Sequence, residues 1–194
     1  MTKNKGRQAF HKSPKKTGKV SAGLPPQTFD PLTGLPDRQA FLLRLQHLLK
    51  RLHREPDYSF AVCFLDLDGF GIVNRRFGHV TGDRFLRTAA ARLQKAIPRN
   101  GMLARYGGDE FAALWENVGD PAAVLNLARR FPRQLNRALV CGKQRVRIGV
   151  SVGVVLSTQA CRKPETLLRR ADKAMFLAKA QGGNQVVLYQ KGCD

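Results

Sequence analysis

The chain has 194 residues, with 34 lysines and arginines against 14 aspartates and glutamates, so its formal net charge is +20, and 43% of its residues are hydrophobic. That hydrophobic fraction is typical of a folded protein and excludes a chain that is disordered throughout. The length suits one domain with a tail better than two full domains. No apolar run approaches the roughly 20 residues of a transmembrane helix, and the basic start leads into no apolar signal segment. We therefore expect a cytoplasmic protein.

The positive charge is uneven along the chain. Residues 1–26 contain seven basic residues and no acidic residue, so we expect a basic, disordered tail followed by one folded domain over residues 27–194. The folded part keeps 27 bases against 14 acids, a net charge of +13. Such an excess fits an ordinary solvated surface. It also fits attraction to an anionic partner such as nucleic acid, a nucleotide or a membrane face.

The first half of the folded part alternates helical and strand patterns. Apolar residues at helical spacing predict a helix over residues 37–53, with Asp37 as its N-cap. The seven-residue apolar run at 59–65 is too short for a typical helix and predicts a buried strand, which ends at Asp66-Leu67-Asp68. The next elements expected are a glycine-bounded connection with a helical turn over 69–78 and a helix over 82–96.

The second half begins with two short strands, at 102–106 and 111–115, which flank Gly107-Gly108-Asp109-Glu110 and predict a hairpin with charge at its tip. The patterns then predict, in order, a helix over 121–139, a strand over 146–156, a helix over 165–180 that ends at Gly182-Gly183-Asn184, and a strand over 185–189. This order predicts an α+β fold, an α/β sandwich in which helices flank a central mixed or antiparallel sheet. The central β-α-β-β-α-β order is that of a ferredoxin-like unit.

Two acidic places stand out in a chain with few acids. Asp66 and Asp68 lie at the end of the buried strand, and Asp109 and Glu110 lie at the hairpin tip. In a ferredoxin-like unit the first strand and the hairpin can lie side by side, which would bring Asp66 close to Asp109. Paired carboxylates beside a main-chain carbonyl suit Mg²⁺, a hard ion that prefers oxygen ligands and also binds substrate phosphates. The alternative is structural, because aspartates at such places also cap helices and stabilise turns.

Residues 105–111, Arg-Tyr-Gly-Gly-Asp-Glu-Phe, resemble the signature of the GGDEF family, the diguanylate cyclases. Four further blocks resemble other motifs of the family: DPLTGLPDR at 30–38, LDLDGFGIVNRRFGHVTGDRFL at 65–86, SVGV at 151–154 and ADKAMFLAK at 171–179. The five blocks fall in the family's order between residues 30 and 179. The resemblance implies the ferredoxin-like palm of nucleotidyl cyclases and polymerases. It also implies the condensation of two GTP molecules to cyclic di-GMP and pyrophosphate.

The resemblance further implies a head-to-head homodimer with one GTP in each subunit and Mg²⁺ or Mn²⁺ as cofactor. By this analogy the metal is held by Asp66, the Leu67 carbonyl and Asp109. Asp109 is also the family's position for the base that accepts the 3′-hydroxyl proton, with Glu110 as its acidic partner. The GTP-binding residues implied in the same way are Phe70, Asn74, Asp83, Gly107, Gly108 and Lys179.

The implied GTP-binding residues have chemistry suited to the parts of the nucleotide. An amide and a carboxylate, supplied by Asn74 and Asp83, match the acceptor and donor atoms of the guanine edge. Lys179 would hold the terminal phosphates. At Gly107 and Gly108 the missing side chains let a nucleotide approach the backbone closely.

Three positions depart from the family pattern. Gly71 stands where the family has a phosphate-binding lysine, Gly183 where it has an arginine, and Arg75 where it has an aspartate. Losing one transition-state cation costs roughly 10² to 10³ in rate. The alternative to a working cyclase is therefore a weak or inactive GTP-binding regulatory module. The nearby cations that could compensate for the missing lysine and arginine are Arg75, Arg76 and Arg84.

The family's inhibitory product site is not expected in this chain. Pro98-Arg99-Asn100-Gly101 occupies the place of its R-x-x-D motif. A third functional possibility is a polyanion- or nucleic-acid-binding protein that acts through the basic segment 1–26, for which we expect an anionic partner.

Overall fold

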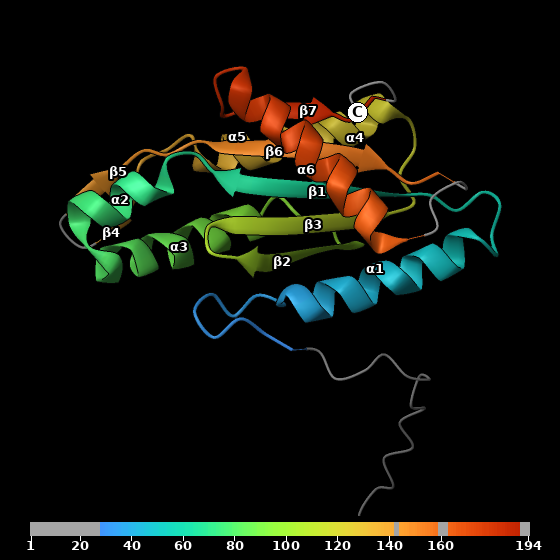
Figure 1. The fold of residues 1–194 in the computed structure, drawn as a ribbon, viewed down its shortest axis with the longest axis horizontal. Helices are drawn as coiled ribbons and strands as arrows, with labels where there is room; N and C mark the ends of the chain where they lie inside the picture. Colours follow the sequence, from blue (N-terminus) through green and yellow to red (C-terminus); the bar gives the residue numbers. More distant parts are fainter. Residues whose placement is uncertain (1–27, 142–143, 159–162, 191–194) are drawn as a thin grey trace, which may run out of the picture.

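The computed structural model describes residues 28–141, 144–158 and 163–190 (Figure 1), so the predicted tail at 1–26 lies outside the described residues. In chain order the helices and strands are α1 (Arg38–Leu52), β1 (Phe60–Leu67), α2 (Phe70–Phe77), α3 (His79–Gln94), β2 (Gly101–Gly107), β3 (Glu110–Glu116), α4 (Pro121–Ala128), α5 (Arg130–Leu135), β4 (Leu139–Cys141), β5 (Gln144–Val146), β6 (Val150–Leu156), α6 (Pro164–Ala180) and β7 (Val186–Leu188). Across these ranges, no helix has the length and apolar character needed to cross a membrane.

β1 lies at the centre of a five-stranded sheet with the strand order β2-β3-β1-β6-β7. β3 and β6 both run antiparallel to β1, whereas β7 runs parallel to β6. Helices cover both faces of this sheet (Figure 1), and every residue of β1 is buried. Phe60, Val62 and Phe64 pack with α1 and α6, while Cys63 and Leu65 pack with α3, α4 and α5 on the other face. The predicted α+β sandwich with a mixed sheet is confirmed.

The segment that follows β1 is the eight-residue helix α2, so the prediction of a mere helical turn over 69–78 was wrong. Phe70 and Val73 are buried on the core side of α2. Gly69 and Gly78 flank the helix with φ angles of 74° and 78°, which glycine adopts without strain. α3 begins at His79, earlier than expected, so a single residue separates the two helices.

The helix expected over 121–139 is two short helices, α4 and α5, with a break at Arg129. Pro132 explains the break, because it has no N–H to donate to the Ala128 carbonyl and its ring would collide with that carbonyl in a continuous helix. The strand expected over 146–156 is also divided. β5 pairs with β4 in a separate two-stranded sheet, and β6 joins the main sheet.

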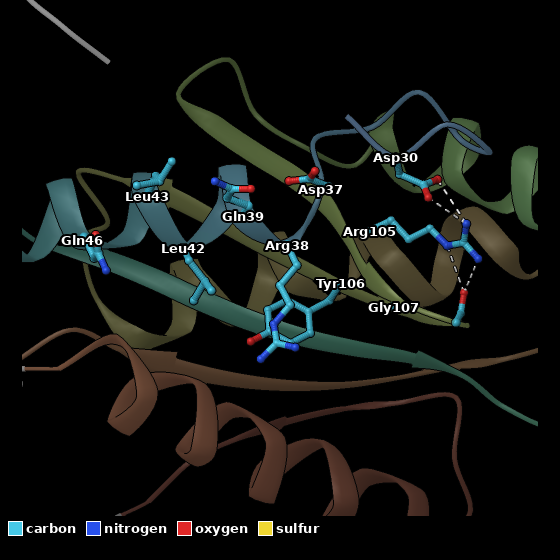
Figure 2. Close-up of a pocket in the computed structure, with 11 residues that line it drawn as sticks. Asp30, Asp37, Arg38, Gln39, Leu42, Leu43, Gln46, Arg105, Tyr106 and Gly107 are labelled. Atoms are coloured by element: carbon cyan, nitrogen blue, oxygen red, sulfur yellow. Dashed lines mark hydrogen bonds and ion pairs between the residues drawn. The ribbon is translucent and has the colours of Figure 1, made fainter. Parts of the chain in front are cut away.

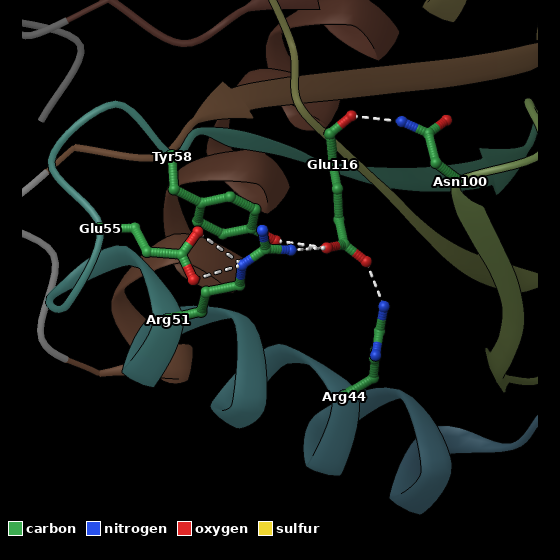
Figure 3. Close-up of polar contacts among 6 residues, drawn as sticks. All are labelled: Arg44, Arg51, Glu55, Tyr58, Asn100 and Glu116. Carbon is green, nitrogen blue, oxygen red and sulfur yellow. Dashed lines mark hydrogen bonds and ion pairs between the residues drawn. The ribbon is translucent and has the colours of Figure 1, made fainter. Parts of the chain in front are cut away.

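The end of β3 remote from the hairpin tip is fastened to α1 by a buried carboxylate (Figure 3). Glu116 is 8% exposed and accepts hydrogen bonds from Arg44, from Arg51 at 3.1 Å and from the Tyr58 hydroxyl at 2.7 Å. Burial and the bond to Glu116 raise the pKa of Tyr58, so its hydroxyl remains a donor. Two guanidiniums and a phenol thus compensate the buried charge and hold α1 against the sheet.

Candidate active site

The end of β1 and the tip of the β2–β3 hairpin lie side by side. β1 pairs with β3 in a register that sets Asp66 opposite Glu110. The Leu67 N–H donates a hydrogen bond to the Asp109 carbonyl at 3.4 Å. The predicted approach of the two acidic segments is therefore confirmed, and antiparallel strand pairing is its cause.

Asp66 is a nearly buried carboxylate that faces α6. The residue is 9% exposed, and its Oδ1 lies 2.7 Å from Nζ of Lys179. Burial raises the pKa of Asp66, and the bond from Lys179 offsets only part of that effect. The negative charges of Asp109 and Asp68 raise the pKa further, so it lies above the ordinary value of 3.8. A bound cation would relieve this cost of holding the carboxylate ionised.

Glu110 experiences the same excess of negative charge. Burial raises the pKa of Glu110 above 4.5, and the carboxylates of Asp66, Asp109 and Asp172 raise it further, while Lys179 opposes the shift. A chain with a net charge of +20 therefore keeps a local surplus of carboxylates at this point. Clustered carboxylates with raised pKa values are typical of catalytic and cation-binding sites.

The donors at this place fit a hard divalent metal ion. In the part of the chain that the structure describes, no group of three or more His, Cys, Asp or Glu side chains converges to hold a metal. A metal here would therefore be held by two carboxylates, those of Asp66 and Asp109, and by the main-chain carbonyl of Leu67, all of which are oxygen donors. Such a set suits Mg²⁺ or Mn²⁺, which complete their coordination with water and substrate phosphates.

Asp68 has a structural role, although it lies only two residues from Asp66. Its Oδ1 accepts a hydrogen bond from the Ser151 hydroxyl at 2.6 Å, and its Oδ2 accepts one from the Asn184 N–H at 2.8 Å. Asp68 therefore ties the end of β1 to β6 and to the turn after α6. The structural interpretation of the strand-end aspartates therefore applies to Asp68. Asp66 makes neither of these bonds and lies beside Lys179, so its role as a metal ligand stays a prediction.

Asn74 and Asp83 are brought to neighbouring positions by the packing of α2 against α3. A Cβ built on Gly82 would lie 1.9 Å from Oδ1 of Asn74, so glycine there makes room for the amide beside Asp83. Asp83 itself is exposed. Phe70, by contrast, is 6% exposed, and its ring packs on Phe85 with the ring centroids 5.8 Å apart. The Phe70 side chain thus belongs to the core, and any contact of this residue with GTP would involve its main chain.

Arg105 connects the hairpin tip to the segment before α1 through hydrogen bonds to Gly108 and Asp30 (Figure 2). Its Nη1 donates to both carboxylate oxygens of Asp30 at 3.0 and 3.1 Å, and its Nε and Nη2 donate to the Gly108 carbonyl at 3.0 and 2.7 Å. Burial alone would raise the pKa of Asp30, but hydrogen bonds from Thr33 and Arg105 outweigh it and lower the pKa. The carboxylate therefore stays charged and anchors the guanidinium that positions the residue just before Asp109.

Sequence reasoning assigned no role to Arg105, although it precedes the glycines directly in the signature block. We expect Arg105→Lys to lower the kcat of the reaction proposed below roughly 10- to 100-fold with little change in KM, because lysine keeps the charge but cannot bridge Asp30 and Gly108 with a planar fork. Steady-state kinetics check this, with the exposed Arg99→Lys as the matched control. An unchanged kcat in Arg105→Lys would show that the bridge does not position the tip.

Gly183, where the family pattern has an arginine, lies in the turn after α6 beside Asp68. Its φ is +72°, and a Cβ built on it would lie 3.1 Å from Oδ2 of Asp68. Glycine fits this backbone without strain. The turn therefore contributes main-chain contacts to Asp68 and no cation at this position.

The model for the family described as "Diguanylate cyclase, GGDEF domain" matches residues 27–185. The chain belongs to the GGDEF domain family. Structures of the same fold include a fragment of TpbB (YfiN) from Pseudomonas aeruginosa that comprises only its GGDEF domain, with 31% identity, a TM-score of 0.79 and coverage of 84% of this chain and 95% of that one. The GGDEF domain of DgcB from Caulobacter crescentus, solved in complex with c-di-GMP, gives 26% identity, a TM-score of 0.78 and coverage of 84% and 96%.

This GGDEF domain is also similar to parts of much longer proteins. The bifunctional diguanylate cyclase/cyclic di-GMP phosphodiesterase MucR of Pseudomonas aeruginosa is 35% identical over 165 residues, which cover 85% of this chain and 24% of MucR. The chain spans about a quarter of the length of the first curated relatives it matches.

Proposed function

We propose that this GGDEF domain is a diguanylate cyclase that condenses two GTP molecules to cyclic di-GMP with release of two pyrophosphates. The observation that carries the proposal is the meeting of Asp66 with Asp109 and Glu110 where β1 ends and β3 begins, with Lys179 bonded to Asp66. Membership of the family and the c-di-GMP complex of the DgcB domain support it.

In this proposal the residues of the two acidic segments bind the metal and accept the proton of the attacking hydroxyl. Asp66, the Leu67 carbonyl and Asp109 would hold Mg²⁺ or Mn²⁺, which neutralises phosphate charge when bound. Asp109 would accept the proton of the 3′-hydroxyl, with Glu110 beside it. The 3′-oxygen of one GTP then forms a bond to the α-phosphorus of the other, and the bond between that phosphorus and the pyrophosphate oxygen breaks. Lys179 would bind the leaving pyrophosphate.

The remaining predicted residues would orient the nucleotide. Asn74 and Asp83 would pair with the guanine edge, and Gly107 and Gly108 would let the nucleotide lie close to the hairpin backbone. Phosphoryl transfer depends mainly on positioning and charge neutralisation, so these groups are sufficient in kind. Because each site holds one GTP, two subunits must meet head to head for the reaction.

The test is incubation of the pure protein with GTP and Mg²⁺ at several protein concentrations, with cyclic di-GMP measured by chromatography and mass spectrometry. We expect product whose rate per subunit rises with protein concentration, because two subunits must associate. Asp109→Ala, checked for an unchanged melting temperature, is the control and should form none. Absence of cyclic di-GMP from the wild type at the highest concentration would overturn the proposal.

A second candidate is a GTP-binding regulatory module without turnover. The observations that favour it are Gly71 and Gly183, two glycines where the family pattern has phosphate-binding cations. It predicts GTP binding by the wild type without cyclic di-GMP in the same assay.

A further inference from the structure

Arg75 reaches back over Gly71, the position at which this chain lacks a phosphate-binding lysine. A Cβ built on Gly71 would lie 3.4 Å from Nη1 of Arg75. Residues 71 and 75 are about one helical turn apart in α2, and side chains on a helix lean toward its N-terminus. The Arg75 guanidinium therefore lies toward the end of α2 that directly follows Asp66, Leu67 and Asp68.

Arg75 is available to bind an anion. Its side chain is exposed and makes no hydrogen bond or ion pair with any of the described residues. Its neighbour Arg76 lies differently, with its guanidinium over the Phe77 ring at 5.2 Å from the centroid. The first turn of α2 also lacks a side-chain cap at Gly69, so main-chain N–H groups and a guanidinium are available at the same helix end.

The two sides of α2 match the two ends of a nucleotide. Asn74 points toward Gly82 and the proposed guanine contacts on α3. Arg75 is the next residue and is rotated by about 100° around the helix, which turns it away from that contact. One short helix can therefore contact the base with one side chain and the phosphates with the next.

We propose that Arg75 binds the terminal phosphates of GTP and replaces the cation lost at Gly71. The assignment rests on the proposed function, since it names a residue that binds the substrate of that reaction. The positive charge has moved by one helical turn, and the longer arginine side chain spans the difference. A guanidinium also offers phosphate two parallel N–H donors, where an ammonium offers a single charge.

The experiment compares binding of two nucleotides by calorimetry in the presence of Mg²⁺. One is the GTP analogue with a methylene group between the α- and β-phosphorus atoms, which cannot release pyrophosphate, and the other is GMP. We expect Arg75→Ala to weaken binding of the analogue roughly 10- to 100-fold and to change GMP affinity less than about twofold. Arg76→Ala, the matched control, should leave both affinities unchanged.

A rescue variant separates phosphate binding from any effect on folding. In the Arg75→Ala background the nearest obstacle to a side chain at residue 71 is gone, so Gly71→Lys should restore binding of the analogue without changing that of GMP. If wild type and Arg75→Ala bind the analogue equally, the phosphate-binding role of Arg75 is wrong, but the proposed function still stands. The same follows if Arg75→Ala weakens binding of the analogue and of GMP by the same factor. A wild type that binds neither nucleotide overturns the proposed function and the assignment with it.

Discussion

Gly153→Ala is expected to lower the stability of the domain by about 4 kcal/mol, or by roughly 8 to 16 °C in melting temperature. Gly153 lies in β6 where α6 crosses the strand. A Cβ at this position would lie 1.9 Å from the Ala171 carbonyl oxygen and 2.2 Å from the Met175 nitrogen. Both are backbone atoms, so α6 itself would have to move, and the single methyl costs more than ordinary overpacking in a core.

Thermal unfolding of Gly153→Ala beside Gly119→Ala checks this expectation. Gly119 has an ordinary backbone conformation, and nothing lies within 4 Å of a Cβ built on it. Its replacement should therefore change stability by no more than about 0.5 kcal/mol. Equal melting temperatures for the two variants would contradict the close approach of α6 to β6.

Asp66→Asn is expected to lower the proposed cyclisation rate by roughly 10³ or more without destabilising the metal-free protein. The amide has nearly the shape of the carboxylate but is a poor ligand for a hard cation. Because burial raises the pKa of Asp66 above 3.8, the ionised form costs stability as the pH rises through that raised pKa. Removing the charge therefore leaves the melting temperature at neutral pH unchanged or higher.

The measurements are binding of Mn²⁺ by electron paramagnetic resonance, cyclic di-GMP formation and thermal unfolding. Asp68→Asn makes the same chemical change two residues away and should give the reverse result. It weakens the bonds from Ser151 and Asn184, so we expect a loss of about 2 kcal/mol in stability with Mn²⁺ binding retained. Retained Mn²⁺ binding and turnover in Asp66→Asn would exclude Asp66 as a ligand.

The pH dependence of metal binding follows from the same carboxylates. The pKa values of Asp66 and Glu110 are raised above 3.8 and 4.5, chiefly by burial. A group with a raised pKa takes up its proton at a higher pH than an ordinary carboxylate does. When the pH is lowered, protons therefore begin to compete with the metal while the pH is still above those ordinary values. Affinity for Mn²⁺ should therefore fall on acidification in the wild type, and fall over a lower pH range in Asp68→Asn, which removes one of the charges that raise the pKa of Asp66. Electron paramagnetic resonance of bound Mn²⁺ at a series of pH values checks both expectations.

Local patterns carried much of the prediction of the fold. The capping oxygen of Asp37 accepts a hydrogen bond from the Ala40 N–H as expected, and Gly182 to Asn184 end α6 with positive φ angles. The break at Arg129 could also have been predicted, because Pro132 was visible in the sequence. The division of 146–156 could not, since a β-branched strand pattern does not show which partner each part of a strand will have.

The sequence by itself determined the excess of positive charge, with 34 bases in 194 residues. It also predicted the fold class and the two acidic segments. The tertiary structure decided which aspartate lies at the candidate site, because the turn after α6 and the neighbouring strand β6 bind Asp68 and leave Asp66 beside Lys179. It also decided where the Arg75 side chain lies, since Arg75 extends over Gly71 only within a formed helix. Composition and spacing report on residues that are near one another in sequence, whereas a site depends on contacts between side chains that are distant in sequence.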